Sequence, residues 1–347
     1  MIPIIANTDF EKLAALDDFS SFIWTSRYYS AGDFELVVPV SPVSLAVMRK
    51  GFYVFRDDTE DDVGIIETLD IQKNADGEET IIAKGRFLTS ILGRRIVAEQ
   101  TQINNQTIDA ACSTLITNEI IEPEIEERAI DNFTIDGTFT TAKKITIQIT
   151  GKNLLDAIGG ICEANGIGFR VGLSGSDFVF QMYEGTDRSY AQSVNPYVVF
   201  SDKYDNLMSS EYQENYMNVV TDVLIAGEGE GLDRKTLWVT KAGLSGLERY
   251  EYYKDARNMS TNDGEIPEEE YFEQLAAEGA ESITDYTAAF SGEVDFSGIR
   301  YGVDVFLGDI CTVENTRWGL YMNSRLVEVI ESIDESGAYT ITPTFGI

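Results

Sequence analysis

Hydrophobic and polar residues alternate along most of the first 97 positions, which is the pattern of half-buried β-strands. The stretch SFIWTSRYYSAGDFELVVPV predicts a hairpin that turns at Gly32 and Asp33. The strand GFYVFRDD and a second hairpin around IETLDI follow it. Residues 1–97 are therefore expected to form a first β-barrel domain.

The spacing of hydrophobic residues changes after this region. Two segments place their apolar residues at helical intervals, namely TIDAACSTLITNEII, which begins at Thr107, and NLLDAIGGICEANG, which begins at Asn153, with Gly166 as the stop of the second. The segments KKITIQIT, GFRVGL and DFVFQMY read as strands between and after them. We expect residues 98–197 to form an α+β domain.

Strand patterns return in the last third of the chain. YMNVVTDVLIAG, KTLWVTKA, YGVDVFLGDICTV and the C-terminal hairpin predict a second β-barrel domain made of residues 198–240 and 297–347. Residues 241–296 differ, because Pro267 followed by three glutamates is a favourable helix start. This segment is expected to be a small, partly helical insertion, so the predicted fold class is mainly β with α+β parts.

Two distant hairpins share nearly the same order of residues. IETLDIQKNADGEETIIAKGR (66–86) and IESIDESGAYTITPTFGI (330–347) align with a one-residue gap, matching Gly77 to Gly337 and pairing Glu67 with Glu328. Upstream of them, Gly51 aligns with Gly308. The alternative explanation is that hairpins resemble one another by composition. Otherwise, the repeat indicates that the two β-barrel domains are related.

Composition restricts the class of protein. The 347 residues suffice for two to four domains, and 43% hydrophobic residues indicate a folded chain. Neither a signal peptide nor a membrane anchor is expected. The three separated cysteines are expected to be buried, reduced thiols. The net charge, 26 − 59 = −33, disfavours nucleic-acid binding but would suit a protein past which DNA must slide.

Catalytic and cofactor motifs are not evident. The chain has no histidine, which excludes Ser-His-Asp, Cys-His and His-bearing zinc sites. The acidic run from Asp57 to Asp62 could hold calcium but lacks the order of a calcium loop, and Gly227 to Gly231 carries two glutamates that oppose phosphate. We expect no catalytic residue, cofactor or metal. A carboxylate-dependent cell-wall glycosidase remains open, as its acid pair would come from distant segments.

One stretch carries a family resemblance. YEGTDRSYAQSVNPYVVFSDKYDNLMSSEY, together with the Leu-Gly-Asp turn before the last hairpin and the PTFG ending, resembles the siphophage tail-tip hub family, the structural N-terminal region of tail-associated lysins. That family is similar to the central hub of contractile-tail baseplates. The matching residues with an expected structural role are Gly185, Asp187, Arg188, Ser189, Phe200, Ser201, Asn206, Gly308 and Asp309. Within the motif, Asp187 and Arg188 are expected to cap or pair within a turn, and Gly185 to supply a backbone conformation.

The resemblance implies a homotrimer in a bacteriophage tail tip. Three chains with two related barrels each would place six similar units on a sixfold tail tube. Implied partners are a distal tail or tail tube protein, the tape measure protein, a separate cell-wall hydrolase or spike, and passing DNA that is not specifically bound. The expected location is the virion, after synthesis in the bacterial host cytoplasm. Alternatives are the hub of a phage-derived contractile bacteriocin and, given 17 tyrosines, a carbohydrate-binding receptor module.

Overall fold

The computed structural model describes residues 1–59, 62–295 and 298–346 of the chain. It is mainly β, with 41% strand and 17% helix, which confirms the predicted fold class. The α-helices are α1 (Pro42–Val47), α2 (Ile108–Ile116), α3 (Leu154–Glu163) and α4 (Glu268–Ala280), and the other helical residues lie in short 3₁₀ or π-helical segments. The strands are β1 (Pro3–Ala6), β2 (Lys12–Ala15), β3 (Ser21–Arg27), β4 (Asp33–Pro39), β5 (Tyr53–Arg56), β6 (Gly64–Lys73), β7 (Glu79–Phe87), β8 (Thr101–Thr107), β9 (Phe133–Ile135), β10 (Lys144–Ile149), β11 (Gly168–Ser174), β12 (Asp177–Tyr183), β13 (Val199–Ser201), β14 (Glu211–Asn215), β15 (Asp222–Ala226), β16 (Thr236–Thr240), β17 (Glu251–Asp255), β18 (Thr287–Ser291), β19 (Ile310–Asn315), β20 (Leu320–Asp334) and β21 (Tyr339–Gly346).

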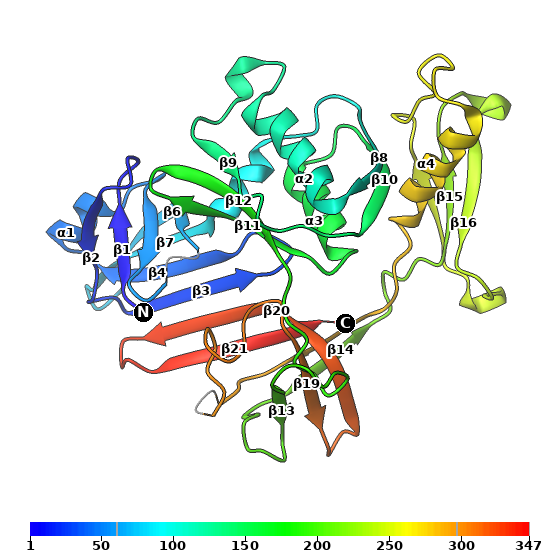
Figure 1. The fold of residues 1–347 in the computed structure, drawn as a ribbon. Coiled ribbons are helices and arrows are strands. Elements are labelled where there is room, and N and C mark those ends of the chain that lie inside the picture. Colours follow the sequence, from blue (N-terminus) through cyan, green and yellow to red (C-terminus); the bar gives the residue numbers. More distant parts are fainter. Residues whose placement is uncertain (60–61, 296–297, 347) are drawn as a thin grey trace.

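A single sheet of 13 strands runs through both ends of the chain. Its order is β14-β18-β21-β20-β3-β4-β7-β6-β5-β1-β2, with β19 beside β20 and β13 beside β19. Strands from the two termini therefore lie side by side in the middle of the molecule, where β3 and β20 run next to each other (Figure 1). Most strands of the two β regions predicted from the sequence, β15 and β16 excepted, belong to this one sheet.

The first β unit, β3 to β7, follows its alternating sequence. Burial along β4 alternates strictly, so every second side chain, such as Phe34 and Leu36, points into a core with Phe22 and Trp24. A shift of one residue in the pairing of such a strand would move all of its apolar side chains from the core to the solvent. The sequence pattern thus fixes which face of the sheet carries the core.

The second β unit consists of β14, β18, β19, β20 and β21, and it repeats the pairing of the first. In the first unit the order is β3-β4-β7-β6-β5, and in the second it is β14-β18-β21-β20-β19, with every neighbour antiparallel. The five strands also occur in the same chain order. Phe200, Phe290 and Phe345 fill a separate core beneath the second unit.

The two hairpins agree atom by atom at their turns. In β6-β7, the Asn74 side chain accepts from the backbone N–H groups of Asp76 and Glu78, and Gly77 has φ +91°. In β20-β21, Asp334 accepts in the same way from Ser336 and Ala338, and Gly337 has φ +79°. A short side-chain acceptor and a glycine with positive φ are what such turns require. The hairpins are therefore equivalent at a separation of 337 − 77 = 260 residues.

The structure removes the gap from the sequence alignment. Both hairpins carry a β-bulge at the same place, at Glu67 in β6 and at Val327 in β20, again 260 residues apart. Glu67 thus corresponds to Val327, and the match of Glu67 with Glu328 was wrong by one residue. A bulge adds a residue on one strand only, so a comparison by composition does not reveal it.

The upstream glycines are equivalent, as the sequence predicts. Gly51 and Gly308 have φ +84° and +94°, and each donates its N–H to the first strand of the following hairpin, at Ile66 and Leu326 respectively. These two acceptor residues are themselves 326 − 66 = 260 residues apart. Matched bonds outside the hairpins argue against a chance resemblance of composition.

The α+β unit lies between the two β units in sequence. It contains the β8-β10 pair, the β9, β11 and β12 sheet, and the helices α2 and α3, which pack on a common core. The apolar residues at helical spacing in α2 are all fully buried: Ile108, Ala111, Cys112, Leu115 and Ile116. Asn153 caps α3 by accepting from the N–H of Leu155, and Gly166 ends the segment with φ +70°.

A small unit holds β15, β16, β17 and α4, which form a sheet and a hydrophobic core of their own. It contacts the α+β unit through α4, whose Gln274 accepts a hydrogen bond from Gln148 of β10 at 3.3 Å. Tyr271 and Leu275 of α4 pack on Val223 and Ile225 of β15. The sequence pattern predicted that residues 198–240, which contain β15 and β16, belong to the second β-barrel domain and that the insertion spans 241–296. Pairing instead assigns both strands to the small sheet and β18 to the large one. Alternation identifies a strand but not its partner, which is why the boundary differs.

The glutamate of the GEGEG loop makes this small unit sensitive to acid. Glu228 accepts from the backbone N–H of Thr261 at 2.7 Å and pairs with Lys235 at 3.0 Å. The Thr261 bond and the ammonium lower the pKa of Glu228 to about 2. Because the folded pKa lies below the unfolded value of about 4.3, this stabilisation is present at neutral pH and is lost as pH falls from about 4.3 toward 2.

We therefore expect Glu228→Gln to weaken the small unit at pH 6 and to have little further effect near pH 2. Hydrogen exchange of the β15 amides in the full chain measures this difference. Glu230→Gln, two residues away and exposed, is the matched control and should change neither value. An effect of Glu228→Gln that is equal at both pH values would contradict the assignment.

Candidate functional site: the joints between the two β units

The seam between β3 and β20 joins the two β units within one chain. Seven residue pairs form it, from Arg27 opposite Glu328 to Ser21 opposite Asp334. β20 is 15 residues long, so its first half pairs with β19 of the second unit and its second half with β3 of the first. One strand thereby fixes the position of the two units relative to each other.

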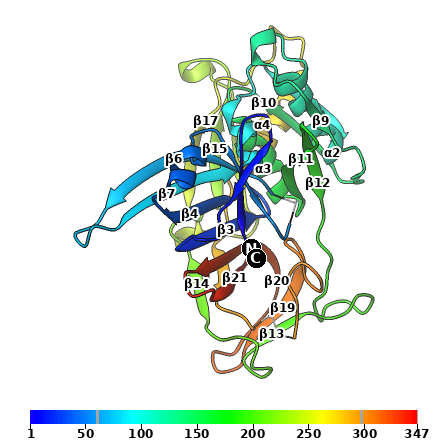
Figure 2. The same cartoon turned by 90° about the vertical axis from the view of Figure 1, so that its left-hand side faces the viewer.

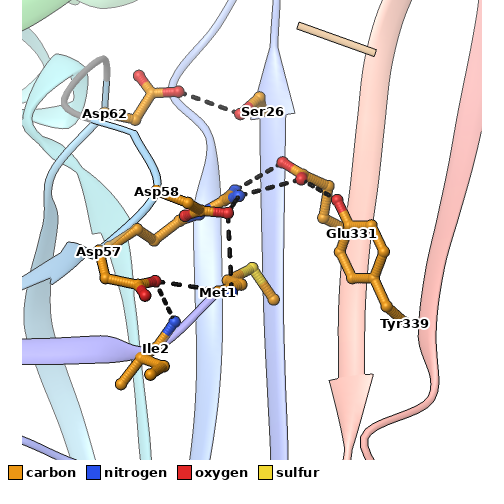
Figure 3. A network of polar contacts seen from close by, with 9 residues as sticks. Met1, Ile2, Ser26, Asp57, Asp58, Asp62, Glu331 and Tyr339 are labelled. Carbon is orange, nitrogen blue, oxygen red and sulfur yellow. Dashed lines mark hydrogen bonds and ion pairs between the residues drawn. The ribbon is translucent and has the colours of Figure 1, made fainter. Parts of the chain in front are cut away.

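A buried ion pair locks this seam (Figure 3). The Arg56 guanidinium of β5 donates from Nη1 to Glu331 at 2.6 Å and from Nη2 to Asp58 at 2.8 Å. Arg56 and Glu331 expose only 5% and 7% of their side chains. The Tyr339 hydroxyl donates to Glu331 from β21, and the guanidinium lies 5.7 Å from the Trp24 ring centroid. Residues from both β units therefore contribute to the Arg56–Glu331 ion pair.

The electrostatics of this cluster favour the charged pair. Burial by itself opposes the charge on Arg56, but hydrogen bonds and attraction from Asp58 and Glu331 outweigh it and raise the pKa of the guanidinium. Burial and the neighbouring Glu331 carboxylate also raise the pKa of Tyr339, so its hydroxyl keeps the proton that it donates. A buried pair of this kind costs much to break because the remaining partner is left unpaired.

The motif residues around Gly185 and Gly308 form a second joint, where all three larger units meet. A Cβ on Gly185 would lie 1.9 Å from the carbonyl oxygen of Gly308, and a Cβ on Gly308 would lie 2.2 Å from the Tyr28 ring. Tyr28 directly follows β3, and its hydroxyl accepts a hydrogen bond from the Gly185 N–H at 3.2 Å. Close backbone approach, and not an unusual conformation, is therefore what requires Gly185, which differs from the expectation.

Asp309 is the central acceptor of this second joint. Its carboxylate accepts from the Thr186 N–H at 2.7 Å, from Arg188 Nε at 2.8 Å and from the Phe306 N–H at 3.0 Å. Its side chain is only 3% exposed. Arg188 was expected to pair within its own turn, yet its partner lies 121 residues away. Asp187 does bond locally, accepting from the Ser189 N–H at 2.8 Å.

The remaining motif residues shape the loop after β13. Asn206 accepts from the Ser201 N–H at 2.9 Å and donates to the Val199 carbonyl at 2.8 Å, so its side chain closes the turn. The Ser201 hydroxyl donates to Glu314 of β19 at 2.6 Å. Phe200 is fully buried in the second core. The structure thus brings the motif residues together as a support for the second β unit.

Sequence reasoning missed Tyr28, Arg56 and Glu331 as joint residues. One signal for Glu331 was present, because it occupies a core-facing position of β20, between Val329 and Ile333. A carboxylate within a hydrophobic alternation predicts a buried partner. Nothing in the sequence identifies that partner as Arg56, since the two residues are 275 positions apart.

Within the described ranges, no group of three or more acidic, cysteine or histidine residues could hold a metal ion. In the acidic run, Asp58 pairs with Arg56 and Asp57 accepts from the Ile2 N–H, whereas Glu60 and Asp61 lie outside the described residues. The three cysteines are buried and form no disulfide. No helix in the described part of the chain is long and apolar enough to cross a membrane.

The face of the sheet opposite the core, which we call the open face, carries paired charges. Arg27 binds Asp33 and Glu328, Lys84 binds Glu35, and Arg86 binds Glu67 at 2.8 Å. These three cations each have a carboxylate partner within the sheet. Such a face offers little free positive charge to a phosphate group.

Comparisons with solved structures find the same fold in tail proteins. A tail protein from Neisseria meningitidis MC58 matches with a TM-score of 0.60 and 14% identity, covering 100% of this chain and 96% of that one. The 43 kDa tail protein of prophage MuSo2 from Shewanella oneidensis gives 0.56 and 12%, covering 99% and 98%. The prophage tail protein gp18 from Listeria monocytogenes EGD-e gives 0.54 and 12%, covering 100% and 94%.

A comparison with curated protein sequences finds no match. A family model does match, and it spans nearly the whole chain, from residue 2 to residue 347. The match includes both β units, the joints between them and the small unit. The chain therefore belongs to the Siphovirus ReqiPepy6 Gp37-like protein family, a family of siphovirus tail proteins.

Proposed function

We propose that this tail protein is the subunit of a trimeric tail-tip or baseplate hub. The observation that carries the proposal is the repeated β unit, with the same strand order, the same bulge and the same turn chemistry in both copies. Two equivalent units held rigidly in one sheet give each chain two equivalent surfaces. Three chains then present six such units, which suits docking of a threefold hub onto a sixfold tail tube.

The proposed hub closes the tail tube and lets DNA pass when it opens. The open face of the sheet supports this role, because its cations already hold carboxylates within the protein. Each chain carries −33, so a trimer brings together 3 × −33 = −99 charges. A lining of this sign would not retain the DNA backbone, as retention needs basic residues that replace its counterions.

The proposed setting is the virion tail tip, with a distal tail or tail tube protein above the hub and the tape measure protein ending at it. The role is structural and not enzymatic, and a separate hydrolase or spike would supply any cell-wall cleavage. The four-part division of the chain belongs to the same proposal, with the insertion redrawn around β15, β16, β17 and α4. Support for a structural role comes from the family, whose members are tail proteins.

Native mass spectrometry of the purified chain at micromolar concentration tests the assembly. We expect a species of 3 × 38.6 = 115.8 kDa in moderate salt. Because self-repulsion is screened over about 10 Å at 0.1 M salt and over about 30 Å at 0.01 M, the trimer should weaken when the salt is lowered to about 0.01 M. A monomer at micromolar concentration and moderate salt would contradict the proposal.

A further inference from the structure

The outer edge of β6 lacks a partner that its equivalent in the second unit has. Residues Thr68 to Lys73 pair with β7 on one side, and in the described part of the chain no strand pairs with their other side. The equivalent segment of β20, 260 residues later, pairs with β3 over its whole length. The β6-β7 hairpin projects away from the body of the protein, as Figure 2 shows.

The complementary edge is also free. β14 corresponds to β3, because both begin the order that continues through β4 or β18 to the hairpin. The registers make Trp24 equivalent to Tyr212, since each is opposite a phenylalanine, Phe34 or Phe290, that is in turn opposite equivalent residues of the hairpin. β14 is the last strand of the large sheet, so its outer edge is unpaired among the described residues.

From these two edges we infer that β6 of one copy pairs with β14 of the next copy, in antiparallel orientation and in the register of the β3-β20 seam. The inference rests on the proposed trimer and names the contact that closes it. Within one chain, Glu331 lies opposite Trp24. The same register between chains places Ile71 opposite Tyr212 of the partner subunit. Every junction around the ring would then repeat one geometry, whether it lies within a chain or between chains.

The side chains suit this register. Ile71 is 60% exposed in the single chain and would be covered by the neighbouring tyrosine. The directly opposed pairs would be Thr68 with Asn215, Leu69 with Glu214, Asp70 with Gln213, Ile71 with Tyr212, Gln72 with Glu211 and Lys73 with Ser210. None of these pairs sets two carboxylates against each other. A slip of two residues in one direction would oppose Asp70 with Glu211 and Glu67 with Glu214, which is unfavourable.

The free edge of β6 also presents backbone N–H and C=O groups to a partner strand. At the turn, Asn74 N–H bonds to the Glu78 carbonyl. From Thr68 onward, past the bulge, even-numbered residues of β6 therefore bond to β7 and odd-numbered ones face the free edge. The N–H and C=O groups of Leu69, Ile71 and Lys73 are thus available to a partner strand. Exposed edges of this kind are templates for pairing, and a second copy whose own edge is free satisfies both.

Engineered cysteines test the register directly. In the seam, Tyr28 N–H bonds to the Val327 carbonyl, so Thr25 opposite Ile330 is a closely spaced pair without mutual hydrogen bonds. Its counterpart between chains is Asp70 with Gln213. Under oxidation, the chain carrying both Asp70→Cys and Gln213→Cys should form disulfide-linked dimers and a linked species of three chains on a non-reducing gel. The native cysteines are buried and do not interfere.

The control chain carries Asp70→Cys with Glu214→Cys, which the register places on opposite faces, and it should link no more than Asp70→Cys alone. If native mass spectrometry shows a trimer but the two pairs link equally poorly, the inferred joint is wrong and the proposed hub stands. If the unmodified chain is a monomer, both fail. Efficient linking of the control pair would also overturn the register.

A proline at the free edge gives a second measurement. Ile71→Pro removes an N–H that the single chain does not use, so its thermal unfolding should change little while the trimeric fraction falls at least tenfold. Gln72→Pro, one residue on, removes an N–H that bonds to β7 and should disturb the hairpin itself. A trimer unaffected by Ile71→Pro would argue against pairing at this edge.

Discussion

Replacing Arg56 with methionine is expected to lower the free energy of unfolding by about 3–5 kcal/mol. The change leaves Glu331 buried without its cation, although the Tyr339 hydroxyl still donates a hydrogen bond to it. Urea unfolding at pH 7 and low protein concentration measures the effect, and the buried Trp24 next to Arg56 reports the transition by fluorescence. Because the seam holds both β units, the loss should appear in one cooperative step.

Two further variants separate the buried pair from ordinary charge effects. Arg86→Met breaks the pair with Glu67, whose members expose 52% and 27% of their side chains, and should cost less than about 1 kcal/mol. The double variant Arg56→Met with Glu331→Met removes both charges and should recover most of the stability. Equal losses of stability in the Arg56 and Arg86 variants would show that burial does not raise the cost of breaking the Arg56–Glu331 pair.

Local patterns in the sequence predict the elements of this fold well, and they predict the partners of those elements poorly. The helical spacing from Ile108 to Ile116 identifies α2 and its buried face, because both depend on residues within a few turns. The equivalence of Gly51 and Gly308 was also readable, since each precedes a strand with a fixed turn requirement. Pairing of β15 with β17, and of β3 with β20, depends on residues far apart and leaves no comparable pattern.

The candidate joints show the same limit. Family motif residues located the neighbourhood of Asp309 but not its bond to Arg188, because short motifs record which residues recur and not what they touch. The repeat was detectable from Gly77 and Gly337, yet its meaning for assembly appears only when the two units are compared edge by edge. The edge of β6 can be recognised as unpaired because the equivalent segment of β20 pairs with β3 along the same edge.

Replacing Asp309 with alanine should cost about 3–5 kcal/mol, comparable to the loss at the seam. The variant leaves the Arg188 guanidinium, 17% exposed, without its carboxylate and leaves the N–H groups of Thr186 and Phe306 without their acceptor. Asp309→Asn keeps the volume and one acceptor oxygen, so its loss should be smaller. Urea unfolding of the unmodified protein, the Asp309→Asn variant and the Asp309→Ala variant should give free energies of unfolding that decrease in that order.

Gly185→Ala probes the same joint without removing any charge. Its new methyl group would lie 1.9 Å from the Gly308 carbonyl oxygen, a backbone atom that cannot move without displacing the strand before the last hairpin. Overpacking of this kind costs about 1–3 kcal/mol. Gly137→Ala is the matched control, as nothing lies within 4 Å of the added carbon, and its stability should be unchanged or slightly higher. Since the joint positions the second β unit, Gly185→Ala should also reduce trimer formation, whereas Gly137→Ala should not. A stable, fully trimeric Gly185→Ala chain would show that the joint tolerates displacement and does not set the geometry of the ring.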